Sequence, residues 1–124
     1  MDPNISIPSI GGQQTNEYQN NVYSKIKFER PCRIHYHPNV FIDENQILKF
    51  KNNQYMGDFT LFCENLLNTL AEYTEQFPCQ GVIEWEGEDT VDYGYYEMKR
   101  NGEWNCHFKK RYNQYPSPWE EFED

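Results

Sequence analysis

Apolar and polar residues alternate through the region from Val22 to Phe50, and this alternation predicts strands. Lys25-Ile26-Lys27-Phe28 shows it most plainly, since every second residue is apolar, as in a strand with one buried face. Pro31, Pro38 and the segment Asp43-Glu44-Asn45 interrupt the pattern, because proline and short polar side chains favour turns. We therefore expect three short strands in this region.

A helix is predicted over residues 58–77. Asp58 is a good N-cap, because its carboxylate can accept hydrogen bonds from the free amide groups of the first turn. Apolar residues then recur at steps of three and four until Pro78, and they form one stripe. The stripe consists of Phe59, Phe62, Leu66, Leu70, Tyr73 and Phe77. A sheet or a second helix must cover such a stripe.

The period returns to two after Gly81, where a further strand is predicted. Ile83 and Trp85 share one face of it, and Glu84 and Glu86 share the other. The order of strands, helix and strands predicts an α+β fold. Its single, mostly antiparallel sheet has the one central helix packed on one face.

A hairpin is predicted around Asn101-Gly102, between the alternating segments 91–100 and 103–112. Asn-Gly favours a two-residue type I′ turn, in which both central residues have positive φ. This turn pairs Arg100 with Glu103, and one face of the hairpin then holds more large apolar groups than the other. We expect that face to meet the helix, and its pairs are Lys99 with Trp104, Glu97 with Cys106 and Tyr95 with Phe108.

Length and composition indicate one folded domain. A chain of 124 residues is long enough for one modest core, and an aromatic content of 17% is higher than disordered chains have. We expect a polar N-terminal leader over residues 1–21, the domain over residues 22–115 and an acidic tail over residues 116–124. The alternation of Ile5 and Ile7 could add a short edge strand.

The negative charge is distributed unevenly. Residues up to Thr60 contain six acids and six bases, whereas residues 61–124 contain fourteen acids and five bases, which gives the net charge of −9. Such a surface suggests a positively charged partner; a merely solvated acidic face is the alternative. The predicted partner-binding residues form two patches, Glu84, Trp85, Glu86, Glu88, Asp89, Asp92 and Tyr93 in one and Glu120, Glu121, Glu123 and Asp124 in the other. The acids would steer association, while Trp85 and Tyr93 would anchor the complex.

Histidines and cysteines are the candidates for metal or nucleophile chemistry. His35 and His37 are expected on the same side of one strand, where they could ligate zinc together with His107 and Cys32 or Cys106. No other feature matches a metal-site pattern, so a solvated strand face is the favoured interpretation. No catalytic residue, metal or other cofactor is predicted. The cysteines form no CxxC pair and are expected to be reduced thiols, although a disulfide between Cys32 and Cys106 stays open.

Several functional classes lack their sequence signatures. The chain has no P-loop, no GxGxxG and no GxSxG. The basic run Lys109-Lys110-Arg111 is a poor footprint for a phosphate backbone in so acidic a chain, and it is expected to offset acids across the sheet. No secretory signal and no membrane-spanning stretch is recognised, so we expect a cytoplasmic location.

Four segments have a familiar layout. They are the strand ending at Phe50, the helix Phe59-Thr60-Leu61-Phe62-Cys63, the strand Ile83-Glu84-Trp85-Glu86 and the hairpin from Tyr95 to Trp104. The region from Ile47 to Tyr112 thereby resembles small immunity proteins of bacterial polymorphic or contact-dependent toxin systems. Such proteins are typically small, acidic and cytosolic. The resemblance implies that the chain binds and neutralises a cognate toxin, often a basic nuclease.

We therefore expect a non-enzymatic acidic binding protein that neutralises a basic protein partner, which would be a toxin or a nucleic-acid enzyme. No direct contact with nucleic acid or membrane is expected. One alternative is a phage- or virus-encoded protein whose acids mimic DNA phosphates and inhibit a host defence or nucleic-acid enzyme. A structural or assembly subunit is another, and an enzyme would require the histidines to converge in a pocket. A neighbouring toxin gene would favour immunity, and a phage early operon would favour the mimic.

Overall fold

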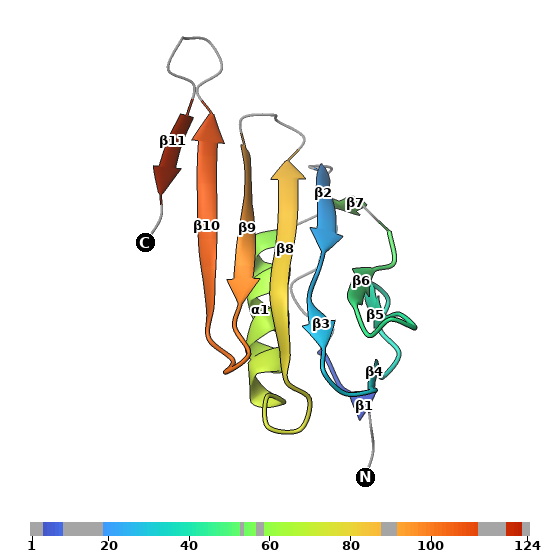
Figure 1. The fold of residues 1–124 in the computed structure, drawn as a ribbon. Coiled ribbons are helices and arrows are strands. Elements are labelled where there is room, and N and C mark those ends of the chain that lie inside the picture. The colour runs from blue at the N-terminus through green and yellow to red at the C-terminus, as the bar shows by residue number, and fades with distance from the viewer. Residues whose placement is uncertain are drawn as a thin grey trace.

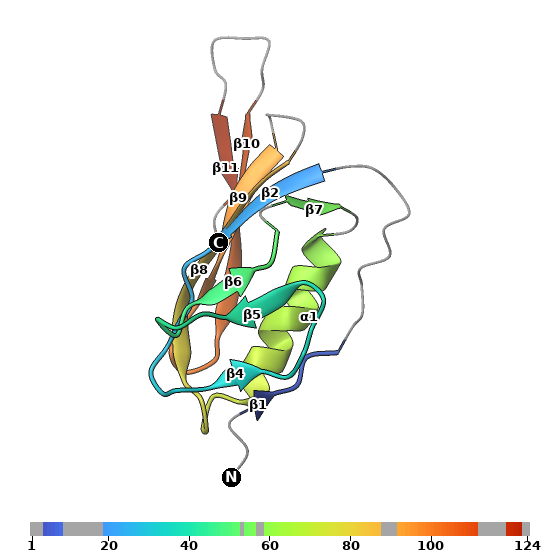
Figure 2. The same cartoon turned by 90° about the vertical axis from the view of Figure 1, so that its right-hand side faces the viewer.

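The computed structural model describes residues 4–8, 19–52, 54–56, 59–87, 92–111 and 119–122. Its main sheet has seven strands, in the order β11-β10-β9-β8-β2-β7 with β3 also beside β8, and each neighbouring pair is antiparallel. The strands are β2 Gln19–Ser24, β3 Lys27–Phe28, β7 Gln54–Met56, β8 Cys79–Gly87, β9 Asp92–Met98, β10 Trp104–Arg111 and β11 Trp119–Phe122. The helix α1, Phe59–Glu72, lies on one side of this sheet (Figures 1 and 2). The α+β fold with a single helix is confirmed for the described residues.

Two small sheets extend the core beside α1 (Figure 2). β1 Asn4–Ile5 pairs in parallel with β4 Arg33–Ile34, and β5 Val40–Ile42 pairs antiparallel with β6 Leu48–Phe50. In the N-terminal segment, Ile5 and Ile7 are buried in the core. The short strand predicted from their alternation is therefore present, and it pairs with β4.

The core forms between α1 and the face of the main sheet that the helix covers. The apolar stripe of α1 is buried, as the spacing of its residues predicts, and comprises Phe59, Phe62, Leu66 and Leu70 together with Cys63 and Leu67. From the sheet, the inward residues of β8 alternate with exposed glutamates. The ring of Phe50 in β6 lies 5.8 Å from that of Phe59 and 6.2 Å from that of Phe62. These contacts join the β5–β6 hairpin to the same core.

The helix is shorter than the predicted range of 58–77. It ends at Glu72, and turns follow in which the amides of Gln76 and Phe77 both donate to the carbonyl of Tyr73, at 3.0 and 2.7 Å. Phe77 is nevertheless buried, so the apolar stripe continues past the helical hydrogen bonds. The predicted N-cap, Asp58, lies outside the described residues.

The turn between β9 and β10 has three residues and not the two that Asn101-Gly102 predicts. The amide of Gly102 donates to the carbonyl of Lys99 at 2.9 Å, and the amide of Lys99 donates to the carbonyl of Glu103 at 2.8 Å. Gly102 has a φ of 97°. In three-residue hairpins, a residue with such a left-handed φ commonly follows a type I turn. The central residues of the turn are thus Arg100 and Asn101.

This turn shifts the pairing of the hairpin by one residue. Residue Trp104 pairs with Met98, and Cys106 pairs with Tyr96, and these side chains face the helix. The indole Nε1 of Trp104 donates to Oδ1 of Asn68 on α1 at 3.0 Å. Trp104 and Cys106 of β10 therefore face the helix as predicted. The prediction is wrong for β9, because a shift of one residue moves each side chain of a strand to the other face. The residues expected there include Tyr95 and Glu97, which lie on the other face of the sheet.

Gly102→Ala should destabilise the domain by about 1–3 kcal/mol, because an L-residue is strained at this φ. A Cβ would also lie 2.8 Å from Oγ1 of Thr74, whose hydroxyl donates to the carbonyl of Ala71 at 2.7 Å. Urea unfolding with a constant m-value would measure the change. In a Thr74→Ala background, Gly102→Ala should lower the free energy of unfolding by a smaller amount. An equal cost in both backgrounds would show that the contact with Thr74 has no effect.

Candidate functional site

The face of the main sheet opposite α1 carries a row of aromatic and acidic residues. Tyr23 on β2 pairs with Glu84 on β8, Glu84 pairs with Tyr95 on β9, and Tyr95 pairs with His107 on β10. Directly paired residues point to the same face of a sheet, so this row crosses four strands on one surface. On the same face, Glu86 on β8 pairs with Tyr93 on β9 and lies next to this row. No described helix covers this surface (Figure 2).

A groove of about 470 Å³ lies on this open face. Its lining consists of Tyr23, Glu84, Trp85, Glu86, Tyr93, Gly94 and Tyr95. Trp85 pairs with Gly94, and the Trp85 ring lies on the helix side of the sheet beside Phe59. These two residues therefore contribute the floor beneath the outward side chains. The walls are therefore tyrosine rings from two strands, and the carboxylates stand on the strand between them.

The two groove carboxylates differ in their partners. Glu84 Oε1 lies 3.6 Å from Lys25 Nζ, and both side chains are about half exposed or more, at 49% and 67%. An exposed pair at this distance is weak, because water screens it and both side chains lose freedom to form it. Glu86 is also exposed, and it forms no ion pair with the described residues. The groove thus has carboxylates that an external cation can reach.

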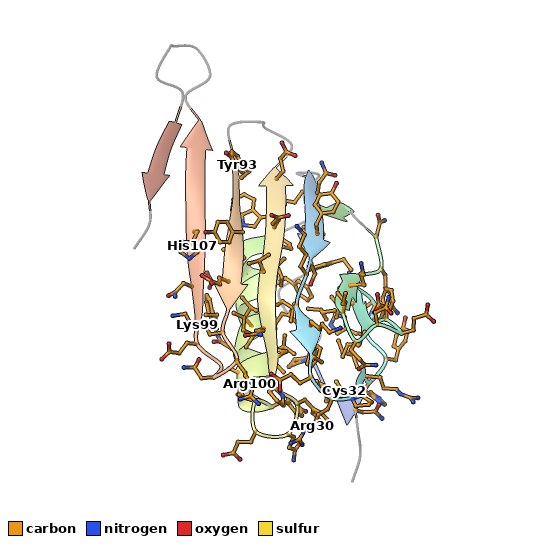
Figure 3. The ribbon with its side chains drawn as sticks, viewed as in Figure 1. Arg30, Cys32, Tyr93, Lys99, Arg100 and His107 are labelled. Carbon is orange, nitrogen blue, oxygen red and sulfur yellow. The ribbon has the colours of Figure 1, made fainter. Side chains whose placement is uncertain are left out.

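Tyr95 is held in place by its neighbour on β10. Its ring stacks on the imidazole of His107, with centroids 4.6 Å apart and planes inclined by 15°. Nε2 of His107 in turn lies 3.4 Å from Oε1 of Glu97. Figure 3 shows His107 on β10 and Tyr93 near the start of β9. A ring that is already stacked loses less conformational entropy when a ligand packs on it.

Three basic residues lie at the end of the sheet away from the groove. Arg30, Lys99 and Arg100 lie far from Tyr93 along the strands (Figure 3). Arg100 forms a two-point pair with Glu29, with Nε–Oε2 at 2.5 Å and Nη2–Oε1 at 3.0 Å. The pair lowers the pKa of Glu29 and raises that of Arg100, chiefly through these hydrogen bonds. The charges of this end are therefore partly neutralised, whereas Glu84 and Glu86 in the groove are exposed.

The first predicted patch is only partly assembled in the groove. Glu84, Glu86 and Tyr93 lie there as expected. Trp85, however, is only 8% exposed, and its ring centroid lies 6.5 Å from that of Phe59. The indole belongs to the core, so Trp85 is not the exposed anchor that the sequence predicts. Glu88 and Asp89 fall outside the described residues, while Asp92 begins β9.

The second predicted patch contains an edge strand. Glu120 and Glu121 lie in β11, where they pair with Lys110 and Lys109 of β10. Glu123 and Asp124 lie outside the described residues. The register of β10 and β11 thus gives acidic and basic residues paired positions.

The sequence did not identify Tyr23 and Tyr95 as site residues. Tyr23 is 49% exposed, and its place between the buried Val22 and Ser24 is visible in the alternation of the first strand. Tyr95 was expected to face the helix, and only the three-residue turn puts it on the open face. The exposed position of Tyr95 therefore depends on the three-residue turn, in which Gly102 has a left-handed φ.

The histidines do not form the predicted strand face. β4 ends at Ile34, so the alternation stops before His35, which is exposed. His37 is only 1% exposed, and its Nδ1 accepts the amide hydrogen of Asn39 at 3.0 Å. The ring lies 5.8 Å from Phe62. His37 therefore belongs to the core and His35 to the surface.

The three buried cysteines, Cys32, Cys63 and Cys79, are unsuited to nucleophilic chemistry. All four are free thiols. Burial raises the pKa of Cys32 to about 11 and that of Cys79 to about 12, and it also raises the pKa of Cys63. A high pKa disfavours the thiolate, which is the nucleophile and metal ligand. Within the described part of the chain, no three histidine, cysteine or acidic residues are grouped to hold a metal ion.

Burial of His37 should make the protein less stable in mild acid. Desolvation lowers the pKa of His37, and the charge of Lys51 lowers it further, against an opposing interaction with the Pro8 carbonyl. Because the folded-state pKa lies below the unfolded value near 6.5, the unfolded state takes up the proton first as pH falls. The free energy of unfolding should then fall below pH ~6.5, by up to about 1.4 kcal/mol per pH unit.

Urea unfolding between pH 7.5 and pH 5 would measure this slope. His37→Asn keeps an acceptor for the amide of Asn39 and should reduce the slope, whereas His35→Asn at the exposed position should leave it unchanged. An equal slope in wild type and His37→Asn would exclude His37 as the titrating group.

Comparisons with known proteins add no assignment. The chain matches no protein-family model, no curated protein and no solved structure. No helix in the described ranges has the length and apolar character needed to cross a membrane. The candidate site consequently rests on the geometry of the open sheet face.

Proposed function

We propose that this chain is a non-enzymatic binding protein that neutralises a basic protein partner, as an immunity protein neutralises a toxin. The acidic and tyrosine-lined groove on the open face of the sheet is the observation that carries the proposal. It combines two exposed carboxylates, Glu84 and Glu86, with Tyr23, Tyr93 and Tyr95 on the two neighbouring strands. Tyrosine is a frequent anchor in protein interfaces, because its ring packs while its hydroxyl stays wet.

The charge of the chain supports a basic partner in particular. The net charge is −9, and among the described residues Glu84 has only a single-point pair with Lys25, in contrast to the two-point pair of Glu29 with Arg100. Long-range attraction raises the rate of association between complementary surfaces, whereas buried contacts at the centre slow dissociation. In this proposal the acids bring the partner to the sheet, and the tyrosines hold it.

The partner itself can be found by affinity capture from the native host with wild type, a Glu84→Gln/Glu86→Gln variant and a Glu44→Gln/Glu103→Gln control in parallel. The control removes the same charge from two exposed loop positions. A protein captured by wild type and the control but lost with the groove variant, and carrying a net positive charge, is the expected result. Capture of the same proteins by all three variants would contradict the role of the groove.

The captured partner then allows a kinetic test. The association rate should fall by about tenfold or more between low and physiological ionic strength, because salt screens the attraction. The groove variant should associate more slowly than wild type, and the control should show a smaller reduction. One equivalent of wild-type protein should abolish the partner's activity. A rate that does not respond to salt, or full activity in the saturated complex, would overturn the proposal.

A further inference from the structure

We propose that the groove is a site for an arginine side chain presented by the partner. This inference rests on the proposed function, since it names the group through which a basic partner would be held. Three observations carry it: the position of Glu84 between two tyrosines, the second carboxylate two residues further along the strand, and the ion pair that Glu84 already makes with Lys25.

Glu84 is flanked by aromatic rings on both sides. Tyr23 and Tyr95 are its paired residues on β2 and β9, and two strand spacings separate them, which is about 9.5 Å. A planar cation can stack on a tyrosine face and still place its hydrogen atoms toward a carboxylate between the rings. Tyr23 is half exposed, and the ring of Tyr95 is held against His107. Both walls are therefore available without rearrangement of the sheet.

The two carboxylates favour a guanidinium group over an ammonium group. Glu84 and Glu86 point the same way from one strand, and their backbones are about 6.6 Å apart. A guanidinium group has five N–H donors in one plane, so it can bond to acceptors on two of its edges while its faces stay free for stacking. An ammonium group is compact and strongly hydrated, and it offers no flat face to a ring. The groove volume of about 470 Å³ is of the size that small ligands occupy.

Lys25 shows that Glu84 accepts a cation at this place. Its ammonium group lies 3.6 Å from Glu84 Oε1, and its side chain is 67% exposed. The lysine is thus a weakly held competitor at the edge of the groove. Removal of its charge should strengthen binding of an external guanidinium group, whereas a surface on which Glu84 had no role would not respond in this way.

The experiment is an NMR titration of the full-length chain with N-acetyl-arginine-N-methylamide and, separately, with the corresponding lysine derivative. We expect saturable shift changes concentrated at Tyr23, Glu84, Glu86 and Tyr95 with the arginine derivative, and affinity at least about fivefold weaker for lysine. Lys25→Met should tighten arginine binding. Glu84→Gln/Glu86→Gln should abolish it, and Tyr23→Leu should reduce the preference over lysine. The matched control Glu103→Gln should bind as wild type does, and unchanged spectra outside the groove would show that each variant is folded.

Three results would overturn the inference. They are shifts that spread over the acidic surface without saturating, equal affinity for the two derivatives, and equal affinity in wild type and the double variant. The proposed function is judged separately, by the capture and kinetic experiments with the protein partner. A basic partner held without any response to Tyr23→Leu or Lys25→Met would leave that function standing and reject the arginine site. If the groove binds the arginine derivative but the chain neutralises no basic protein, the arginine site stands and the proposed function is rejected.

Discussion

Gly81→Ala is expected to lower the free energy of unfolding by about 3 kcal/mol or more, which is a large part of the stability of a domain of this size. Gly81 has a φ of 144°, where an L-residue is strained. A Cβ at this position would lie 2.3 Å from the carbonyl oxygen of Lys25 and 2.7 Å from Cα of Ile26. Both of those atoms are backbone, so the connection between β2 and β3 would have to move away from β8.

Equilibrium urea unfolding would measure the effect, with Gly102→Ala as the matched control. Both glycines have positive φ, but a Cβ on Gly102 meets the side chain of Thr74, which can rotate. The difference between the two variants therefore reports the backbone contact at Gly81 beyond the cost of its φ. Equal destabilisation by the two substitutions would contradict this argument, because it would mean that the connection between β2 and β3 moves at no cost in free energy.

The elements that the sequence predicts well are those decided by their own periodicity. The apolar stripe from Phe59 to Leu70 needs only its spacing of three and four to define the buried side of the helix. In β8, the alternation that exposes Glu84 and Glu86 and buries Ile83 is equally local. The α+β fold class follows from these patterns because each apolar face requires a cover.

The errors have long-range causes. The Asn101-Gly102 pair is compatible with more than one turn, and the choice of a three-residue turn is visible only in the hydrogen bonds around Lys99. That choice decides which side of β9 meets α1, so a single local error moved Tyr95 to the wrong face. His37 was misplaced because β4 ends early and the chain then bends toward Phe62. Neither fact has a signal within a short window of sequence.

The candidate site was predicted in its charge more than in its aromatic residues. Glu84 and Glu86 stand out as exposed acids by alternation alone, whereas the tyrosines beside them come from two other strands and depend on register. Trp85 is an aromatic residue among acids, but its position between the two glutamates places it on the opposite, buried face. In a strand that alternates strictly, the residues of one interface lie on one face.

The remaining large effect is expected in the helix, where Leu66→Ala should cost about 3–4 kcal/mol. Leu66 is fully buried in the stripe that covers the sheet, and truncation would remove its buried methyl groups and leave a cavity that the surrounding rings cannot fill completely. Leu61→Ala is the control, because Leu61 lies on the same helix with 46% of its surface exposed and should cost no more than about 1 kcal/mol. Urea unfolding would compare the two, and similar costs at both positions would mean that α1 does not pack against the sheet through the stripe. In the Leu66→Ala variant the open face of the sheet should lose its groove only with global unfolding, because Glu84 and Tyr95 stand on strands that this core supports from behind.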